Sequence, residues 1–386
     1  MSTPILGTPP EGIVTRCRAA IVALGPDVRE VLPAWIVARV LVGVGYALAW
    51  GVVQRSFGGA RPPQLSEGLL VWDGSYYRDI ATIGYGALPV GALRFFPLYP
   101  LLARALAVVL LGHVELSLLL IANGCALALA VVLRRLVLFE THDAVLARRA
   151  VWLTALFPSA FVLVFAYAEA LFLLLTLLTF WAIRRERWLV AAVCGFLAAL
   201  TRPVGFLLMA PVAVEALRRR RGVTPAEWFR RALAVGAPAV GIALYLTWVD
   251  HRYGDPKLPF TAQSDLRGQG ANPVVTIVHG MGELFGPERF KDFLHIPFAI
   301  AFLVLLVVVL RRWPVSYGVF AAVMLYAALS ATNLNSVERY GLNAFPLILA
   351  LASITTRPRV ERVVLVVSGG GMASLAALAW LGVYVP

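Results

Sequence analysis

Long apolar runs, interrupted by short arginine clusters, occupy almost the whole of this sequence. A helix needs about 20 apolar residues to span a bilayer, so a chain of 386 residues has room for roughly ten crossings. With 60% hydrophobic and 14% charged residues, the chain lacks the polar surface of a water-soluble domain. The sequence therefore predicts one all-α polytopic membrane domain over residues 1–386, and it excludes a soluble enzyme, a fibrous protein and a disordered chain.

The formal net charge of +13 comes from arginine, because Lys257 and Lys291 are the only lysines. In a soluble protein this charge would indicate nucleic-acid binding. Here the arginines lie between apolar runs, which is typical of loops kept on the cytoplasmic side, so we expect no nucleic-acid partner. Arginine, alanine, valine and leucine dominate as in GC-rich bacterial genomes, which predicts a bacterial plasma membrane protein with membrane lipid around it.

The arginine clusters set the predicted topology. Those assigned to the cytoplasmic side are Arg16, Arg18 and Arg29; Arg134, Arg135, Arg148 and Arg149; Arg184, Arg185 and Arg187; Arg218 to Arg221; Arg311 and Arg312; and Arg357, Arg359 and Arg362. Helices that fit between the clusters are predicted at about 32–53, 115–133, 151–167, 170–183, 232–248, 296–310, 315–329, 341–353 and 363–385, with 188–217 going out and back. We expect about 11 crossings (roughly 10–13). Residues 98–111 are too short for a span and predict an embedded or interfacial helix.

Two long polar segments, residues 54–96 and 250–295, then face away from the cytoplasm. The outer turns carry Asp73, Arg94, Glu169, Arg202 and Arg339, which come from separate parts of the chain. Ionisable residues at membrane depth are costly and tend to face a cavity or one another. These five residues are therefore expected to meet at one site on the outer face.

Asp73 lies between Trp72 and the pair Tyr76 and Tyr77. A carboxylate in this position can take a proton from a sugar hydroxyl, and aromatic faces can stack on sugar rings. The alternative is a solvated aspartate among aromatic residues that anchor the loop at the membrane interface. Asp79 is either a second acid or a residue of the helix surface.

Arginines are usually concentrated on the cytoplasmic side of a membrane protein, so arginines on the outer face are unusual. They indicate that an anion binds there. Arg202 and Arg339 offer planar forks that suit phosphate, and Arg94 offers the same with less support. The alternative is that Arg202 and Arg339 form ion pairs with Glu169 or Glu338. Glu169 itself would otherwise be an exposed acid in a turn.

Other chemistry has little support in the sequence. No glycine-rich phosphate loop, HExxH, GxSxG or CxxC motif occurs. His251, His279 and His295 lack the spacing of metal ligands and are expected to be loop residues. We expect neither a metal nor a cofactor.

Several segments, taken in order, resemble the PIG-V type mannosyltransferases of the GT-C superfamily, from about residue 70 to 355. They are WDGSYYRDIATIGYG, FFPLYP, FPSAFVLVFAYAEALFLLLTLLTFWAIRRERW, GFLAALTRPVGF and ERYGLNAFPLILALA. The family's Y-S-E motif corresponds to Tyr167-Ala168-Glu169, its R-P-x-G motif to Arg202 through Gly205, and its late R-Y motif to Arg339-Tyr340. Leu266 stands where the family would have tryptophan, which leaves the acceptor undefined.

The resemblance implies a GT-C-like bundle with short interfacial helices in its first outer loop. It also implies a mannosyltransferase that takes mannose from a polyprenyl phosphate donor and adds it to a lipid-linked or other extracytoplasmic acceptor, such as a glycolipid. Asp73 would be the general base of an inverting displacement. The substrate-binding residues would be Trp72, Tyr77, Asp79, Arg94, Tyr99, Glu169, Arg202, Arg339 and Tyr340.

A transporter or flippase for a lipid-linked sugar would use a similar cavity and similar arginines. Such a protein should show an internal repeat and helices broken near the midplane of the membrane, and the sequence shows neither. A structural membrane subunit is a third reading, but it would not explain the outer-face arginines.

Overall fold

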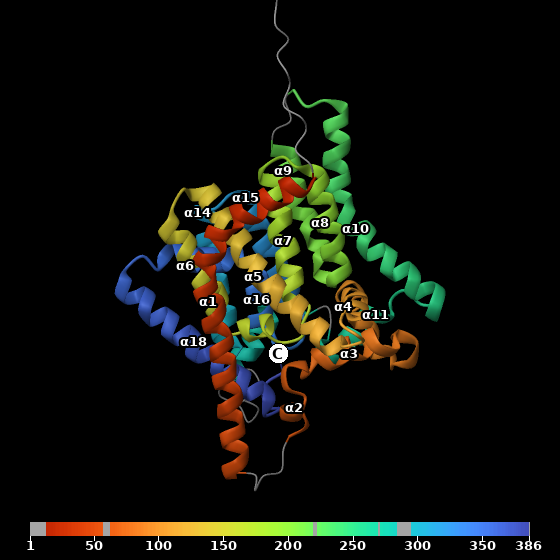
Figure 1. Ribbon diagram of the computed structural model, residues 1–386, viewed down its shortest axis with the longest axis vertical. Coiled ribbons are helices and arrows are strands. Elements are labelled where there is room, and N and C mark those ends of the chain that lie inside the picture. Colours follow the sequence, from red (N-terminus) through yellow and green to blue (C-terminus); the bar gives the residue numbers. More distant parts are fainter. Residues whose placement is uncertain (1–12, 57–61, 219–221, 269–270, 284–294, 386) are drawn as a thin grey trace, which may run out of the picture.

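The computed structural model of the protein describes residues 13–56, 62–218, 222–268, 271–283 and 295–385. In these ranges all regular secondary structure is helical, which confirms the all-α prediction for the described residues. Figure 1 shows the helices gathered into one bundle, with α1 (Ile13–Ser56) running along its side.

Four helices are long and apolar enough to cross a membrane, as judged by length and composition in the described residues. They are residues Gly25–Arg55 of α1, α5 (Val114–Thr141), α10 (Pro225–Tyr253) and α18 (Pro358–Trp380). Shorter apolar helices are α4 (Leu98–Val109), α8 (Trp188–Thr201) and α15 (Val315–Leu329). The count of about 11 crossings therefore stays a prediction, while the short helix expected at 98–111 is present.

Helix α7 (Glu169–Arg184) occupies the middle of the bundle, and most of its residues are buried. It packs against α5 and α8, α10 packs along α8, and α18 packs along α1. Because α7 is apolar around most of its circumference, burial on all sides is what its sequence requires.

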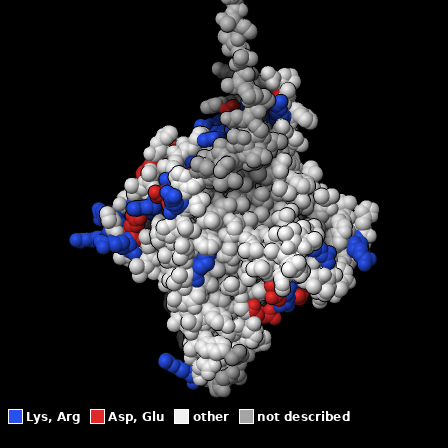
Figure 2. Space-filling view, in the orientation of Figure 1, with Lys and Arg blue, Asp and Glu red and all other residues white. Residues whose placement is uncertain are grey.

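The two ends of the bundle differ in chemistry. The basic end is where α7 and α9 (Met209–Arg218) terminate with Arg184 and Arg218; of the predicted cluster 218–221, only Arg218 lies within the described residues. The site end is where α2 (Pro63–Ser66), α3 (Asp73–Ile83), α4 and α11 (Leu258–Arg267) lie, away from α9 in Figure 1. On the face shown in Figure 2, charged side chains are sparse over the middle of the molecule and gather toward its edges.

The predicted helix 151–167 is wrong. Helix α6 (Ala144–Leu156) ends before Pro158, which cannot donate a helical hydrogen bond, and Phe157 is extended with φ −54° and ψ 143°. A short 3₁₀ turn, Ala160–Leu163, follows in a buried stretch.

Side chains from two other helices satisfy two of the carbonyls that this break leaves without helical partners. Asn123 Nδ2 donates to the Val164 carbonyl at 3.1 Å, and Arg39 Nη2 donates to the Leu163 carbonyl at 3.4 Å. Arg39 Nε also donates to Asn123 Oδ1 at 3.0 Å. The break is therefore stable inside an apolar bundle because α1 and α5 supply its missing donors.

Proline also divides the last predicted return helix, 341–353, into α16 (Val337–Asn343) and α17 (Pro346–Ile354). The predicted turn at Arg202-Pro203 is present between α8 and α9. The segment 250–295 is more helical than a loop, because α10 runs to Tyr253 and is followed by α11 and α12 (Pro273–Glu283), and α14 (Ile296–Arg312) begins where that segment ends. Residues 57–61, 269–270 and 284–294 of the two predicted loops lie outside the described residues.

Candidate active site

The backbone places Asp73 at the first position of α3, where a carboxylate is stabilised by the helix dipole. The preceding residue, Trp72, has φ 59° and ψ −117°, a conformation that an L-residue adopts only at a cost of about 1 to 3 kcal/mol. Trp72 Nε1 donates to the Ala379 carbonyl of α18 at 2.9 Å, which holds the strained turn in place. The start of α3 is thus fixed against a helix more than 300 residues away in sequence.

Asp73 is paired with Arg339 of α16. Arg339 Nη1 donates to Asp73 Oδ2 at 2.6 Å, and the two side chains are 12% and 23% exposed. The same Nη1 lies 3.3 Å from Glu169 Oε1 at the start of α7. Glu169 in turn accepts a hydrogen bond from Arg202 Nη1. Two carboxylates and two guanidinium groups from four separate segments therefore form one continuous chain of charges.

Glu169 is buried beneath this chain, with its side chain 2% exposed, and is not an exposed acid in a turn. It is the first residue of α7, again the position where the helix dipole favours a carboxylate. Arg202 reaches it because the backbone turns sharply after Thr201, where Arg202 is extended and Pro203 starts a 3₁₀ turn. Gly205 permits the turn, since a Cβ there would lie 2.5 Å from the backbone of Ala198.

A cavity of about 390 Å³ opens above these charges. Seven of the residues expected to form the site line it: Trp72, Asp73, Tyr77, Arg94, Arg202, Arg339 and Tyr340. The structure thus brings together residues that the sequence spreads over more than 260 positions.

Arg94 is the cation of the cavity that stands apart from the charge chain. Its guanidinium lies 4.7 Å from the ring centroid of Phe95 and 5.2 Å from that of Tyr76, and these two rings stack on one another at 4.7 Å. No carboxylate pairs with Arg94 among the residues that the structure describes. The aromatic faces orient its guanidinium and leave its charge uncompensated.

Tyr77 lies close to both carboxylates. Burial, followed by the negative charges of Glu169 and Asp73, raises the pKa of Tyr77 above its ordinary value. The phenol therefore stays protonated and can only act as a neutral hydrogen-bonding group in the cavity wall.

Asp79 and Tyr99 do not line the cavity. Asp79 Oδ1 accepts a hydrogen bond from Arg78 Nε at 3.0 Å and lines a separate open hollow beside His113 and Glu115. Tyr99 is fully buried, donates to the Leu118 carbonyl at 2.9 Å and meets the ring of Tyr77 edge to face. A direct substrate contact by Tyr99 is therefore not supported, because its side chain has no exposed surface; it supports Tyr77 from behind.

Glu338, weighed from the sequence as a partner of Arg339, is instead engaged elsewhere. His295 Nδ1 lies 2.7 Å from Glu338 Oε1, and Tyr384 donates to Glu338 Oε2 at 3.1 Å. All three side chains are buried; His295 lies in the turn before α14, outside the helix as expected, but its ring is packed against α16 and not exposed. Among the described residues, no group of three or more histidine, cysteine or acidic side chains is arranged to hold a metal ion.

Several cavity residues were not predicted from the sequence. Gln263 of α11, Asn335, Ser336 and Val385 line the cavity, and nothing in the local sequence pattern singles them out. Tyr167 lies near the charge chain, with the Arg339 guanidinium 6.0 Å from its ring. Its buried hydroxyl has no hydrogen-bond partner among the described residues. Only the Y-S-E resemblance drew attention to Tyr167, and it did so for the neighbouring glutamate.

No protein-family model matches the chain, and a search of curated proteins finds no match. Among solved structures, the chain is similar to the archaeal oligosaccharyltransferase AglB from Archaeoglobus fulgidus, in complex with an inhibitory peptide and a dolichol-phosphate. The TM-score is 0.45 and the identity 11%, over 93% of this chain and 56% of that one. A second structure, the Archaeoglobus fulgidus oligosaccharyltransferase in complex with Zn and sulfate, gives a TM-score of 0.44 and 13% identity over 88% of this chain and 53% of that one. The chain thus spans little more than half the length of the proteins that it resembles in structure.

Proposed function

We propose that the chain is a membrane glycosyltransferase that moves a mannosyl residue from a polyprenyl phosphate donor to a lipid-linked or other extracytoplasmic acceptor. The observation that carries this proposal is the single cavity in which Asp73, Arg94, Arg202 and Arg339 meet, beside the stacked rings of Tyr76 and Phe95. A carboxylate, guanidinium groups and aromatic faces are what an acceptor hydroxyl, a phosphate and a sugar ring require.

Asp73 is the general base in this mechanism. It takes the proton of the acceptor hydroxyl while that oxygen attacks the anomeric carbon of the donor. The bond between the anomeric carbon and the phosphate oxygen breaks, and the polyprenyl phosphate leaves with the electron pair. One displacement inverts the anomeric centre, so a β-linked donor yields an α-mannoside.

The arginines stabilise the phosphate as its negative charge grows. Asp73 and Glu169 offset the charges of Arg202 and Arg339, so those four residues sum to zero, and Arg94 leaves the cavity with a charge of +1. We therefore assign the first contact with the donor phosphate to Arg94. Arg202 and Arg339 have further N–H groups to offer, and drawing Arg339 toward the phosphate would release Asp73 to act as a base.

The cavity lies at the site end, and the helix ends that carry Arg184 and Arg218 lie at the other. With the basic end in the cytoplasm of a bacterial cell, the reaction takes place on the extracytoplasmic side. Arginines that hold a monophosphate make a metal cofactor unnecessary in this scheme. Activity should accordingly survive a chelator.

The test is transfer by the purified chain from labelled polyprenyl phosphate mannose to candidate acceptors, with and without chelator. Asp73→Asn should lower the rate by about 10²- to 10⁴-fold while donor binding is retained, because the amide keeps the shape and cannot take the proton. Asp79→Asn, the same change on the same helix but outside the cavity, is the matched control and should keep its rate.

Equal rates for Asp73→Asn and the wild type would remove the base from the mechanism. Movement of the labelled lipid across the membrane without release of polyprenyl phosphate would favour a flippase instead.

A further inference from the structure

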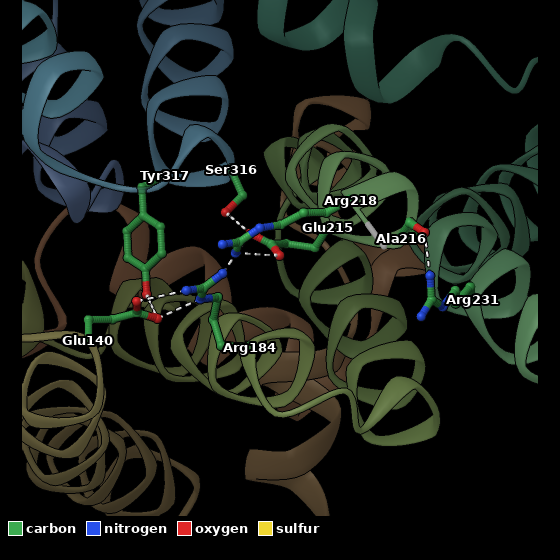
Figure 3. A network of polar contacts seen from close by, with 8 residues as sticks. All are labelled: Glu140, Arg184, Glu215, Ala216, Arg218, Arg231, Ser316 and Tyr317. Carbon is green, nitrogen blue, oxygen red and sulfur yellow. Dashed lines mark hydrogen bonds and ion pairs between the residues drawn. The ribbon is translucent and has the colours of Figure 1, made fainter. Parts of the chain in front are cut away.

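A second polar cluster lies at the basic end, formed where α5, α7, α9 and α15 start or end (Figure 3). Arg184 Nε and Nη2 bind Glu140 at 2.6 and 2.9 Å, and Arg184 Nη1 binds Glu215 at 3.0 Å. Ser316 Oγ donates to Glu215 at 2.7 Å, and Tyr317 donates to Glu140 at 3.2 Å. Both carboxylates are therefore satisfied from within the protein.

A cavity of about 170 Å³ adjoins this cluster. Its wall is made by Phe139, Ile183, Arg184, Glu186, Trp188, Glu215, Arg218 and Arg231. None of the proposed transferase residues lines it. Along the axis of α7 it lies roughly 22 Å from Glu169, given the rise of about 1.5 Å per residue, so it is a separate site at the opposite end of the bundle.

Two groups in the wall are short of hydrogen-bond acceptors. Trp188 is 3% exposed, and its Nε1 has no hydrogen-bond partner among the described residues. Leaving a buried donor unpaired is costly, and such donors in native structures are usually satisfied by a bound group. The Arg218 side chain is 53% exposed, and within the described part of the chain its guanidinium is held only by a long contact of 3.4 Å to Glu215 Oε2.

The charge around the cavity is positive. Of the described residues that line it, Arg184, Arg218 and Arg231 are positive and Glu186 and Glu215 are negative, which is three minus two, or +1. Glu215 already accepts hydrogen bonds from Arg184, Arg218 and Ser316, so its charge is balanced without a bound cation. Arg231 is fixed against the faces of Trp188 and Trp228, with Nη1 donating to the Ala216 carbonyl at 2.8 Å and Nε to Glu227 at 3.3 Å, so only its remaining N–H groups could reach a ligand.

We propose that this cavity binds a phosphate group, with Trp188 Nε1, Arg218 and Arg231 as its donors. The phosphate would belong to the headgroup of an anionic phospholipid or be a free phosphate ion, and the two share the same oxygen acceptors. The neighbouring surface bears Phe229 and Leu217, which are 70% and 46% exposed, as expected for side chains that reach into the acyl region of a bilayer.

Binding to the purified full chain in neutral detergent, measured by calorimetry, tests the proposal. The probes are inorganic phosphate, dihexanoyl phosphatidylglycerol and dihexanoylglycerol, which lacks the phosphate. No sugar donor is present, so the result does not depend on the transferase reaction.

We expect phosphate-dependent binding that Trp188→Phe weakens about tenfold, because the ring is kept and one charge-assisted donor is lost. Trp228→Phe is the matched control, since Trp228 also faces Arg231 but does not line the cavity, and its affinity should stay within about twofold of wild type. Arg218→Gln should also weaken binding about tenfold. This variant should fold, since Glu215 keeps its contacts with Arg184 and Ser316, and it tests the proposal if Trp188→Phe fails to fold.

Tighter binding of phosphatidylglycerol than of phosphate identifies the lipid as the source, and equal binding identifies free phosphate. Dihexanoylglycerol binding as tightly as phosphatidylglycerol, no binding of either phosphate probe, or equal effects of the two tryptophan changes would overturn the proposal.

Discussion

The contact between Glu169 and Arg202 offers the sharpest test of how the candidate site is held together. Their side chains are 2% and 12% exposed, and removing one partner of a buried ion pair costs about 3 to 5 kcal/mol. Arg202→Leu should fall at the lower end, about 3 kcal/mol of unfolding free energy, because Arg339 still contacts Glu169 at 3.3 Å. Glu169→Gln should cost a similar amount, about 3 kcal/mol, since the amide oxygen still accepts a hydrogen bond but carries no charge.

The double variant removes both charges of the pair, so neither charge is left buried without its partner. Its loss should be close to that of one single variant, about 3 kcal/mol, where independent effects would give about 6, so the interaction energy should be about 2 to 3 kcal/mol. Unfolding in mixed micelles, followed by circular dichroism, measures all four proteins in one detergent. Glu67→Gln is the control, because its pair with Arg78 is 39% and 29% exposed and should be worth less than about 1 kcal/mol. An interaction energy below about 0.5 kcal/mol for Glu169 and Arg202 would refute the pairing.

The remaining predictions concern binding, topology and backbone space. Arg94→Leu should weaken donor binding by about 10- to 100-fold, and Arg94→Lys by less; equal affinities for Leu and wild type would move the phosphate to another arginine. In a background without native cysteines, Ser66→Cys and Ser264→Cys should react with an impermeant thiol reagent in intact cells, and protection of both until the cells are permeabilised would reverse the topology. Gly205→Ala should destabilise the fold by about 1 to 3 kcal/mol and reduce transfer, because its Cβ would meet the Ala198 backbone at 2.5 Å; Gly91→Ala, with nothing within 4 Å, should do neither.

Much of the helical layout follows from local sequence. The helix at 315–329 has the predicted bounds, and helices start as expected at Trp188 and Ile296, because arginine clusters, prolines and apolar length act locally. The failures occur at proline. Pro158 and Pro346 each divide a segment whose hydropathy is continuous. Hydropathy is averaged over many residues, so it is insensitive to the loss of one backbone N–H at a proline.

Part of the cavity lining was predictable, but Gln263, Asn335, Ser336 and Val385 were not, and neither was the pairing of Arg339 with Asp73. The sequence placed Asp73, Arg202 and Arg339 on one face by counting crossings, and the structure brings them to one cavity. Which acid each arginine meets depends on how α3, α7 and α16 pack, and sequence pattern carries no such distances. Thus Glu338 contacts His295 and Tyr384, and Arg94 contacts aromatic rings and no acid among the described residues.

The break between α6 and α7 has a consequence for how the chain enters the bilayer. Its carbonyls at Leu163 and Val164 receive hydrogen bonds from Arg39 and Asn123, which belong to helices made earlier on the ribosome. If the break met lipid alone, those carbonyls would be stranded in hydrocarbon, at a cost of several kcal/mol each. We therefore expect α1 and α5 to be in place when the break is buried, and the order of synthesis makes both available before it.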